Sequence, residues 1–167
     1  AQTAMPGEVF PGPGETIITD QVILVVDASG SMYRSDKFAL AHELAHGFWS
    51  AAPTGTYDAG TMSYGSSYTH AWVKHPSQPF NRTDLLGSVG MMSYIGGSTP
   101  MALALKSVGG EIADSVGRTA LVVFSDGKTE PTEVLDTIAR IKEVHQGPLC
   151  VYTVQFGDDE AGGKLLA

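Results

Sequence analysis

Cysteine is almost absent from this chain, since Cys150 is the only one among 167 residues. A single cysteine excludes a disulfide framework and a metal site built from several thiolates. It lies in the apolar run "LCVYTVQF" (149–156), for which we predict a buried strand and an inert thiol. Long apolar runs are missing as well: none approaches the roughly 18 residues that a membrane helix needs. We therefore expect no membrane insertion in this chain.

Charge is sparse, and positive charge is the scarcer kind. Charged residues make up 17% of the chain, with 10 Lys and Arg against 18 Asp and Glu, and the formal net charge is −8. Such an acidic balance disfavours nucleic acid and anionic lipid as partners, and it suits cations or the basic surface of another protein. The 43% of hydrophobic residues is enough for one globular domain with a real core.

The first residues differ in composition from the rest. Residues 1–16 are rich in glycine and proline and show no periodicity, so we predict a loose arm or linker there and a domain over 17–167. The chain starts at Ala1 with neither methionine nor an apolar signal region. We expect either a mature form after signal removal or an excised piece of a longer protein.

Strand and helix patterns alternate along residues 17–167. Continuous β-branched runs predict buried strands, and apolar residues at helical spacing predict helices. In the helix that contains "HELAH", Phe38, Ala41, Leu44, Ala45 and Phe48 share one face. We predict strands at 22–27, 56–65, 69–76, 118–126 and 149–157, with the turn "GSSY" between the second and third, and helices at 36–52, 82–95, 99–116, 131–147 and from 158. The fold class is α/β: a doubly wound, mostly parallel central sheet, helices on both faces, and one antiparallel edge strand.

Two predicted strands each end in aspartate: Asp27 follows "VILVV" and Asp126 follows "ALVVFS". Parallel strands share one carboxyl edge, where open α/β sheets bind their ligands, and two acids there repel each other unless a cation lies between them. Ser29 and Ser31 follow the first acid in "DASGSM", and Thr99 precedes a predicted helix in "GGSTPM", where Pro100 favours a helix start.

The convergent set is all oxygen: Asp27, Ser29, Ser31, Thr99 and Asp126. Ligands of this kind favour a hard divalent cation, foremost Mg²⁺, with Ca²⁺ or Mn²⁺ as alternatives. If the neutral hydroxyls bind directly and the carboxylates act through water, the ion stays electron-poor and prefers an anionic oxygen from outside.

These segments resemble the von Willebrand factor A-type domain and its metal-ion-dependent adhesion site. The family pattern is Asp-x-Ser-x-Ser, then a distant Thr, then a distant Asp, and "DASGS", Thr99 and Asp126 match it in order. The resemblance implies that Ser29, Ser31 and Thr99 ligate the ion directly, while both aspartates hold metal-bound water. A partner protein's Asp or Glu would complete the shell. The resemblance implies protein binding and adhesion, and no enzymatic activity.

The combination "DASGSM…GGSTPM" is most similar to bacterial envelope members of the family, which implies a periplasmic or secreted location. The family usually has a sixth core strand that this chain does not reach, so the domain is expected to lack its last strand. Ser98 is an alternative ligand to Thr99. We predict that Tyr33, Arg34, Ser98 and Lys128 face the partner.

"HELAH" (42–46) spells a zinc-hydrolase motif, in which two histidines bind zinc and a glutamate activates water. A catalytic zinc needs a third ligand, and no suitable motif follows. We expect His42 to lie at the shoulder of the helix beside Trp49 and Glu43 to point to solvent. Three classes thus stay open: a metal-dependent binding module, which we favour; a zinc hydrolase that uses His42, Glu43 and His46; and a structural scaffold with a vestigial metal loop.

Overall fold

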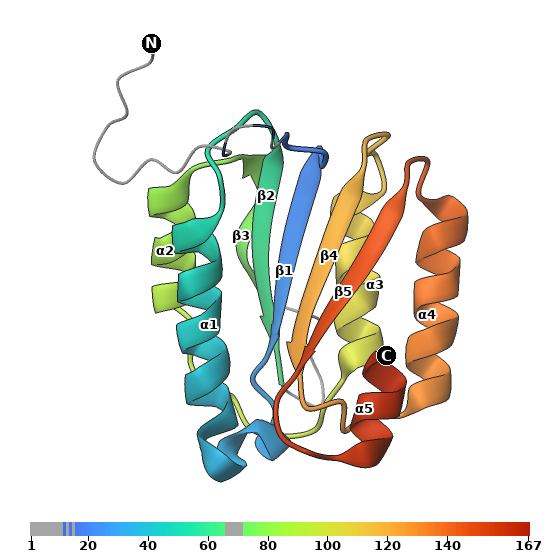
Figure 1. The fold of residues 1–167 in the computed structure, drawn as a ribbon. Helices are drawn as coiled ribbons and strands as arrows, with labels where there is room; N and C mark the ends of the chain where they lie inside the picture. The colour runs from blue at the N-terminus through green and yellow to red at the C-terminus, as the bar shows by residue number, and fades with distance from the viewer. Residues whose placement is uncertain (1–11, 13, 15, 66–71) are drawn as a thin grey trace.

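The structure is a computed structural model that describes residues 12, 14, 16–65 and 72–167 (Figure 1). Most of the predicted arm (1–16) lies outside the described residues. So do nearly all of the predicted turn "GSSY" and the first residues of the strand predicted at 69–76.

A single five-stranded sheet forms the centre of the described part, with the strand order β3-β2-β1-β4-β5. β1 pairs in parallel with β2 and β4, β4 pairs in parallel with β5, and only β3 runs antiparallel, at the edge beside β2. The strands are β1 (Gln21–Asp27), β2 (Asp58–Tyr64), β3 (Trp72–Pro79), β4 (Thr119–Ser125) and β5 (Leu149–Gln155). This confirms the predicted fold class.

Helices cover the two faces of the sheet, as Figure 1 shows. α1 and α2 lie on one face, and α3, α4 and α5 lie on the other. Each face has its own apolar core, centred on alternate residues of β1: Ile23 and Val25 on the α3 side, and Leu24 and Val26 on the α1 side. The helices are α1 (Lys37–Ala51), α2 (Arg82–Gly90), α3 (Met101–Ile112), α4 (Pro131–Val144) and α5 (Glu160–Leu166). None of the helices in these described ranges is both long and apolar enough to cross a membrane.

The buried stripe of α1 differs from the predicted one. It consists of Lys37, Ala41, Ala45 and Trp49, which recur every four residues. Phe38 and Phe48 are half-buried beside it, and Leu44, which the spacing places on the same apolar face, is 44% exposed. Trp49, which the prediction left out of the covered face, is completely buried and donates to Thr61 Oγ1 at 3.1 Å.

β5 is also not the buried strand that its sequence predicts. It lies at the edge of the sheet, its residues are at most half-buried, and Cys150 is exposed. An edge strand has a neighbour on one side only, so apolar composition alone does not bury it. The thiol is therefore accessible.

α2 and α3 differ most from their predicted ranges. α2 ends at Gly90, and the chain then runs as a loop in which the N–H groups of Ile95 and Gly96 both donate to the carbonyl of Ala28 at 3.1 Å. α3 begins at Met101, after Pro100 at the N-cap position, and not at Thr99. Both differences come from the loop over residues 91–100, which docks against the end of β1 instead of continuing a helix.

Candidate functional site at the carboxyl edge of the sheet

The two predicted aspartates lie at the carboxyl ends of neighbouring strands. Asp27 is the last residue of β1, and Asp126 follows directly after β4. β1 and β4 pair in register up to Val26 and Phe124, so both carboxylates come to one edge, the lower edge in Figure 1. Each is fully buried, with 0% exposed. Two buried carboxylates in one place require compensation by donors or by a cation.

The predicted hydroxyl groups form a continuous chain that ends on one of these carboxylates. Thr99 Oγ1 donates to Ser29 Oγ at 3.0 Å, and Ser29 Oγ lies 3.2 Å from Ser31 Oγ. Ser31 Oγ then donates to Asp126 Oδ1 at 3.0 Å. Three segments that are far apart in the sequence thus place four oxygen-bearing side chains in contact.

The other buried carboxylate, Asp27, accepts hydrogen bonds from neutral donors. Its Oδ1 accepts from the N–H of Ser29 at 2.9 Å, and its Oδ2 accepts from Ser125 Oγ at 2.6 Å. Burial raises the pKa of Asp27, and the hydrogen bonds from Ser125 and Ser29 oppose that rise only in part. The ionised form of this carboxylate would therefore gain from a nearby cation.

Asp126 differs, because a basic side chain reaches it. Lys37 Nζ lies 2.5 Å from Asp126 Oδ2, while Oδ1 accepts from Ser31 and from the N–H of Lys128 at 3.2 Å. Lys37 was not among the predicted site residues. The signal that could have found it is its position at the start of the buried stripe of α1, where a lysine needs a partner.

Loop contacts fix the position of the hydroxyls. The N–H of Gly30 donates to the carbonyl of Gly97 at 3.0 Å, and a Cβ on Gly30 would lie 2.8 Å from that oxygen, so only glycine fits. Thr129 Oγ1 donates to the carbonyl of Thr99 at 3.0 Å, which ties the third segment to the loop after β4. Because Thr99 does not cap α3, its hydroxyl is directed to Ser29 instead. Ser98, the alternative ligand, is exposed.

The residues predicted to face a partner are exposed and lie within three positions of site residues in the sequence. Tyr33 is 71% exposed and packs on Tyr94, with ring centroids 5.3 Å apart. Arg34 and Ser98 are exposed, and Lys128 Nζ lies 3.6 Å from Asp159 Oδ2. We call these four exposed side chains the rim.

The histidines of "HELAH" have other partners. His42 Nε2 donates to the carbonyl of Val89 at 2.9 Å, so the proton on this nitrogen stands where zinc would need a lone pair. His46 is exposed and lies 3.4 Å from Ser50 Oγ, and Glu43 is exposed. Within the part of the chain that the structure describes, no group of three His, Cys, Asp or Glu side chains is placed to hold a metal ion. His42 thus joins α1 to α2.

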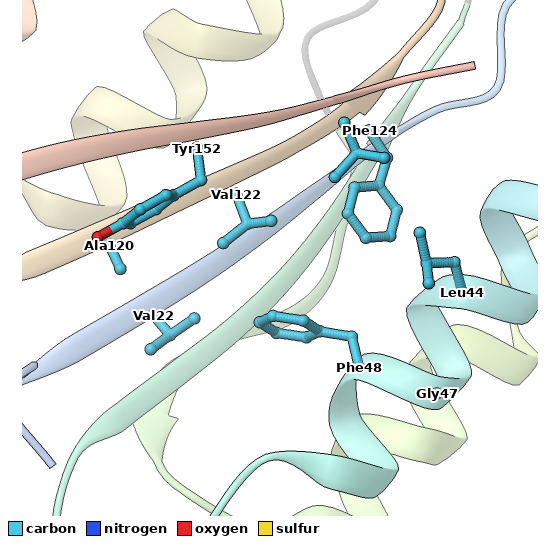
Figure 2. Close-up of a pocket in the computed structure, with 9 residues that line it drawn as sticks. Val22, Leu44, Gly47, Phe48, Ala120, Val122, Phe124 and Tyr152 are labelled. Atoms are coloured by element: carbon cyan, nitrogen blue, oxygen red, sulfur yellow. The ribbon is translucent and has the colours of Figure 1, made fainter. Parts of the chain in front are cut away.

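An apolar hollow of about 550 Å³ lies elsewhere, on the α1 face of the sheet. Figure 2 shows Leu44 and Phe48 of α1 across it from Val122, Phe124 and Tyr152 of the sheet. Val122 and Phe124 of β4 are buried, whereas Tyr152 of β5 is 56% exposed, so the hollow lies open on the β5 side. It holds none of the predicted site residues.

Comparison with known proteins identifies the family. The profile of the von Willebrand factor type A domain matches residues 21–165 of this chain. Among curated proteins, none matches the sequence significantly.

Solved structures with the same fold are distant in sequence. The manganese-loaded TRAP protein of Plasmodium vivax superposes with a TM-score of 0.71 at 18% identity, over 90% of this chain and 63% of that one. A von Willebrand factor type A protein from Catenulispora acidiphila gives 0.67 at 20% identity, over 89% and 36%. The type V pilus tip protein Mfa5 of Porphyromonas gingivalis gives 0.52 at 20% identity, over 66% and 20%. This chain thus spans less than two thirds of each of these structures.

Proposed function

The chain belongs to the von Willebrand factor type A domain family, and from this premise we propose that it is a non-catalytic, metal-dependent protein-binding module. It holds a divalent cation at the carboxyl edge of the sheet and uses that ion to bind an Asp or Glu carboxylate of a partner protein. Ser29, Ser31 and Thr99 are the proposed direct ligands, and Asp27 and Asp126 hold water on the ion.

The observation that carries this proposal is the convergence of oxygen donors at one edge of the sheet. Thr99, Ser29 and Ser31 follow one another at 3.0 and 3.2 Å, and Ser31 continues to the buried Asp126. A donor set made only of oxygen favours a hard divalent cation, foremost Mg²⁺, with Mn²⁺ or Ca²⁺ as alternatives.

The charges of the site explain why a partner carboxylate would be needed. Both oxygens of Asp27 and both oxygens of Asp126 already accept hydrogen bonds or an ion pair from the protein. The carboxylates are therefore better placed to hold water than to ligate directly, and the direct ligands are neutral hydroxyls. When bound, the cation supplies an exposed Lewis-acidic position that attracts an anionic oxygen.

The similar structures support an adhesive role at a cell surface. One is manganese-loaded TRAP, and another is a pilus tip protein. We place this chain in the cell envelope or outside the cell, in a bacterial, periplasmic or secreted protein. The contact surface is the rim formed by Tyr33, Arg34, Ser98 and Lys128, and its partner is a protein.

Titration with divalent ions tests the metal site. We expect Mg²⁺ and Mn²⁺ to raise the melting temperature of the wild type and to bind measurably in calorimetry. Thr99→Ala and Asp27→Ala should abolish this response, whereas Thr83→Ala, at an exposed threonine of α2, should keep it. Ser98→Ala should also keep it, because its hydroxyl is exposed. An unchanged response in both Thr99→Ala and Asp27→Ala would refute the site.

Chelation tests the binding mode. A partner captured in Mg²⁺ should dissociate in excess EDTA and rebind when Mg²⁺ is restored. Full binding in EDTA would mean that another surface carries the interaction. A wild type that folds normally and shows no divalent response would indicate the scaffold class.

A further inference from the structure

Lys37 is a buried cation inside the proposed metal site. Its ammonium contacts Asp126 Oδ2 at 2.5 Å, and its side chain is only 11% exposed. The ion pairs Lys128–Asp159 and Lys164–Glu160, by contrast, lie at the surface. Lysine loses much solvation on burial, so a buried lysine at this position needs the negative charge that it meets.

The backbone is shaped to bring Lys37 to this place. Ser35 and Asp36, just before it, have left-handed conformations with φ of 58° and 54°, which non-glycine residues seldom adopt. After these two residues α1 begins at Lys37, whose side chain is directed to Asp126. Gly157, with φ of +94°, passes the aliphatic stem so closely that an added Cβ would lie 3.3 Å from Lys37 Cδ. Unfavourable backbone angles in a segment that orients one side chain suggest a functional constraint on that side chain.

We propose that Lys37 is a built-in cation that shares Asp126 with the divalent ion: it stabilises the metal-free fold and lowers the affinity of the site for metal. This inference rests on the proposed function, because it concerns the same site. Lys37 is a positioning residue and not a metal ligand.

The charge of the site determines how much a divalent ion gains on binding. Asp27 and Asp126 are both completely buried, and Lys37 pairs with Asp126. With Lys37 in place, the formal charge of the three groups is −1 instead of −2. A divalent ion therefore gains less electrostatic energy on binding and meets a fixed positive charge across Asp126.

The contact also restricts what Asp126 can do. Its Oδ2 faces Lys37, and only Oδ1 faces Ser31 and the hydroxyl chain. Asp126 cannot then present both oxygens to an ion. Lys37 thereby leaves Asp126 a single oxygen on the metal side. The protein then neutralises less of the ion's positive charge, and the ion can attract a carboxylate from a partner protein.

The test removes the charge while keeping an unbranched or nearly unbranched side chain that is one atom shorter than lysine. Lys37→Met and Lys37→Gln would be compared with the wild type by calorimetric titration with MnCl₂ and by thermal unfolding in EDTA. Lys164→Met is the matched control, since it removes a lysine from a surface ion pair. We expect both Lys37 variants to bind Mn²⁺ about tenfold more tightly or better. Their melting temperatures in EDTA should fall by about 5 °C or more, and Mn²⁺ should restore most of the loss. Lys164→Met should match the wild type.

The outcomes separate the proposed role of Lys37 from the proposed metal-dependent function. Equal or weaker Mn²⁺ affinity in Lys37→Gln, with normal binding by the wild type, would overturn the role of Lys37 and leave the proposed function intact. If neither the wild type nor the variants bind Mn²⁺, both proposals fail. A Lys37→Met protein that is unfolded in EDTA and folded with Mn²⁺ would support the inference. If it folds in neither, the affinity of Lys37→Gln decides.

Discussion

The ends of β1 and β4 look alike in sequence but are electrostatically different. Each strand is an apolar run followed by a buried aspartate, and the two strands are parallel neighbours. Asp27 is held only by the neutral donors Ser29 and Ser125, and burial raises its pKa. Asp126 is held by a lysine from α1.

The difference teaches that a strand's own sequence does not determine the charge balance at its end. The donors to Asp27 come from its own loop and from the adjacent strand, so they follow from the sheet. The charged donor to Asp126 is Lys37, the first residue of α1, which belongs to the crossover after β1. A metal ion would therefore compensate Asp27 more than Asp126, because Asp126 already has a cation.

Asp126→Asn should have the largest effect on stability. It leaves Lys37 buried without a negative partner, which typically costs about 3 kcal/mol or more. Chemical denaturation in EDTA would measure the loss. The double variant Asp126→Asn, Lys37→Met should recover much of it, and a double variant no more stable than Asp126→Asn alone would contradict the pairing.

Gly30→Ala should come next, because it disturbs the loop that links the two carboxylates. The added Cβ would lie 2.8 Å from the carbonyl oxygen of Gly97, so one of the two segments must move. We expect a loss of about 1–3 kcal/mol, as for other overpacked sites, and a weaker thermal response to Mg²⁺. Gly87→Ala is the control, since a Cβ there meets nothing within 4 Å. Equal behaviour of the two variants would mean that the loops do not pack as described.

His42→Ala should lower the stability by less, and it should leave the surroundings of both aspartates unchanged. It removes the hydrogen bond to the carbonyl of Val89 that joins α1 to α2, which is worth about 1 kcal/mol. The response to Mg²⁺ should be unchanged. Stoichiometric zinc in the wild type that His42→Ala abolishes, together with proteolysis, would instead favour the zinc-hydrolase class.

Asp27→Asn should change the stability of the metal-free protein least. The raised pKa of Asp27 means that its ionised form is disfavoured in the fold relative to the unfolded chain, so a neutral amide removes that cost at neutral pH. We expect a free energy of unfolding in EDTA at least equal to that of the wild type, within about 0.5 kcal/mol. The response to Mg²⁺ should nevertheless be lost. A destabilisation as large as that of Asp126→Asn would remove the proposed difference between the two carboxylates.

Much of the fold could be predicted from local pattern. The runs that became β1 and β4 are apolar at nearly every position, which requires cover on both faces, and both strands are indeed central. The same reasoning failed for β5, because an apolar run shows that a strand can be buried but not how many neighbours it has. The exposed Cys150 follows from that edge position.

The candidate site shows a similar division. Asp27, Ser29, Ser31, Thr99 and Asp126 could be selected from sequence, because strand ends and loop residues have recognisable patterns. Lys37 was missed: its four-residue spacing with Ala41, Ala45 and Trp49 was a signal, but a lysine at a helix start is usually solvated. Its burial depends on the left-handed turn at Ser35 and Asp36, which has no glycine to signal it.

The sequence by itself determined the order and type of the strands and helices, and which oxygen-bearing side chains follow the two central strands, because these features depend on periodicity and on neighbours along the chain. Only the tertiary structure decided that β5 lies at an edge, that His42 joins two helices, and that Lys37 faces Asp126. These depend on the orientation of whole elements, and orientation is set by packing between segments that are distant in sequence.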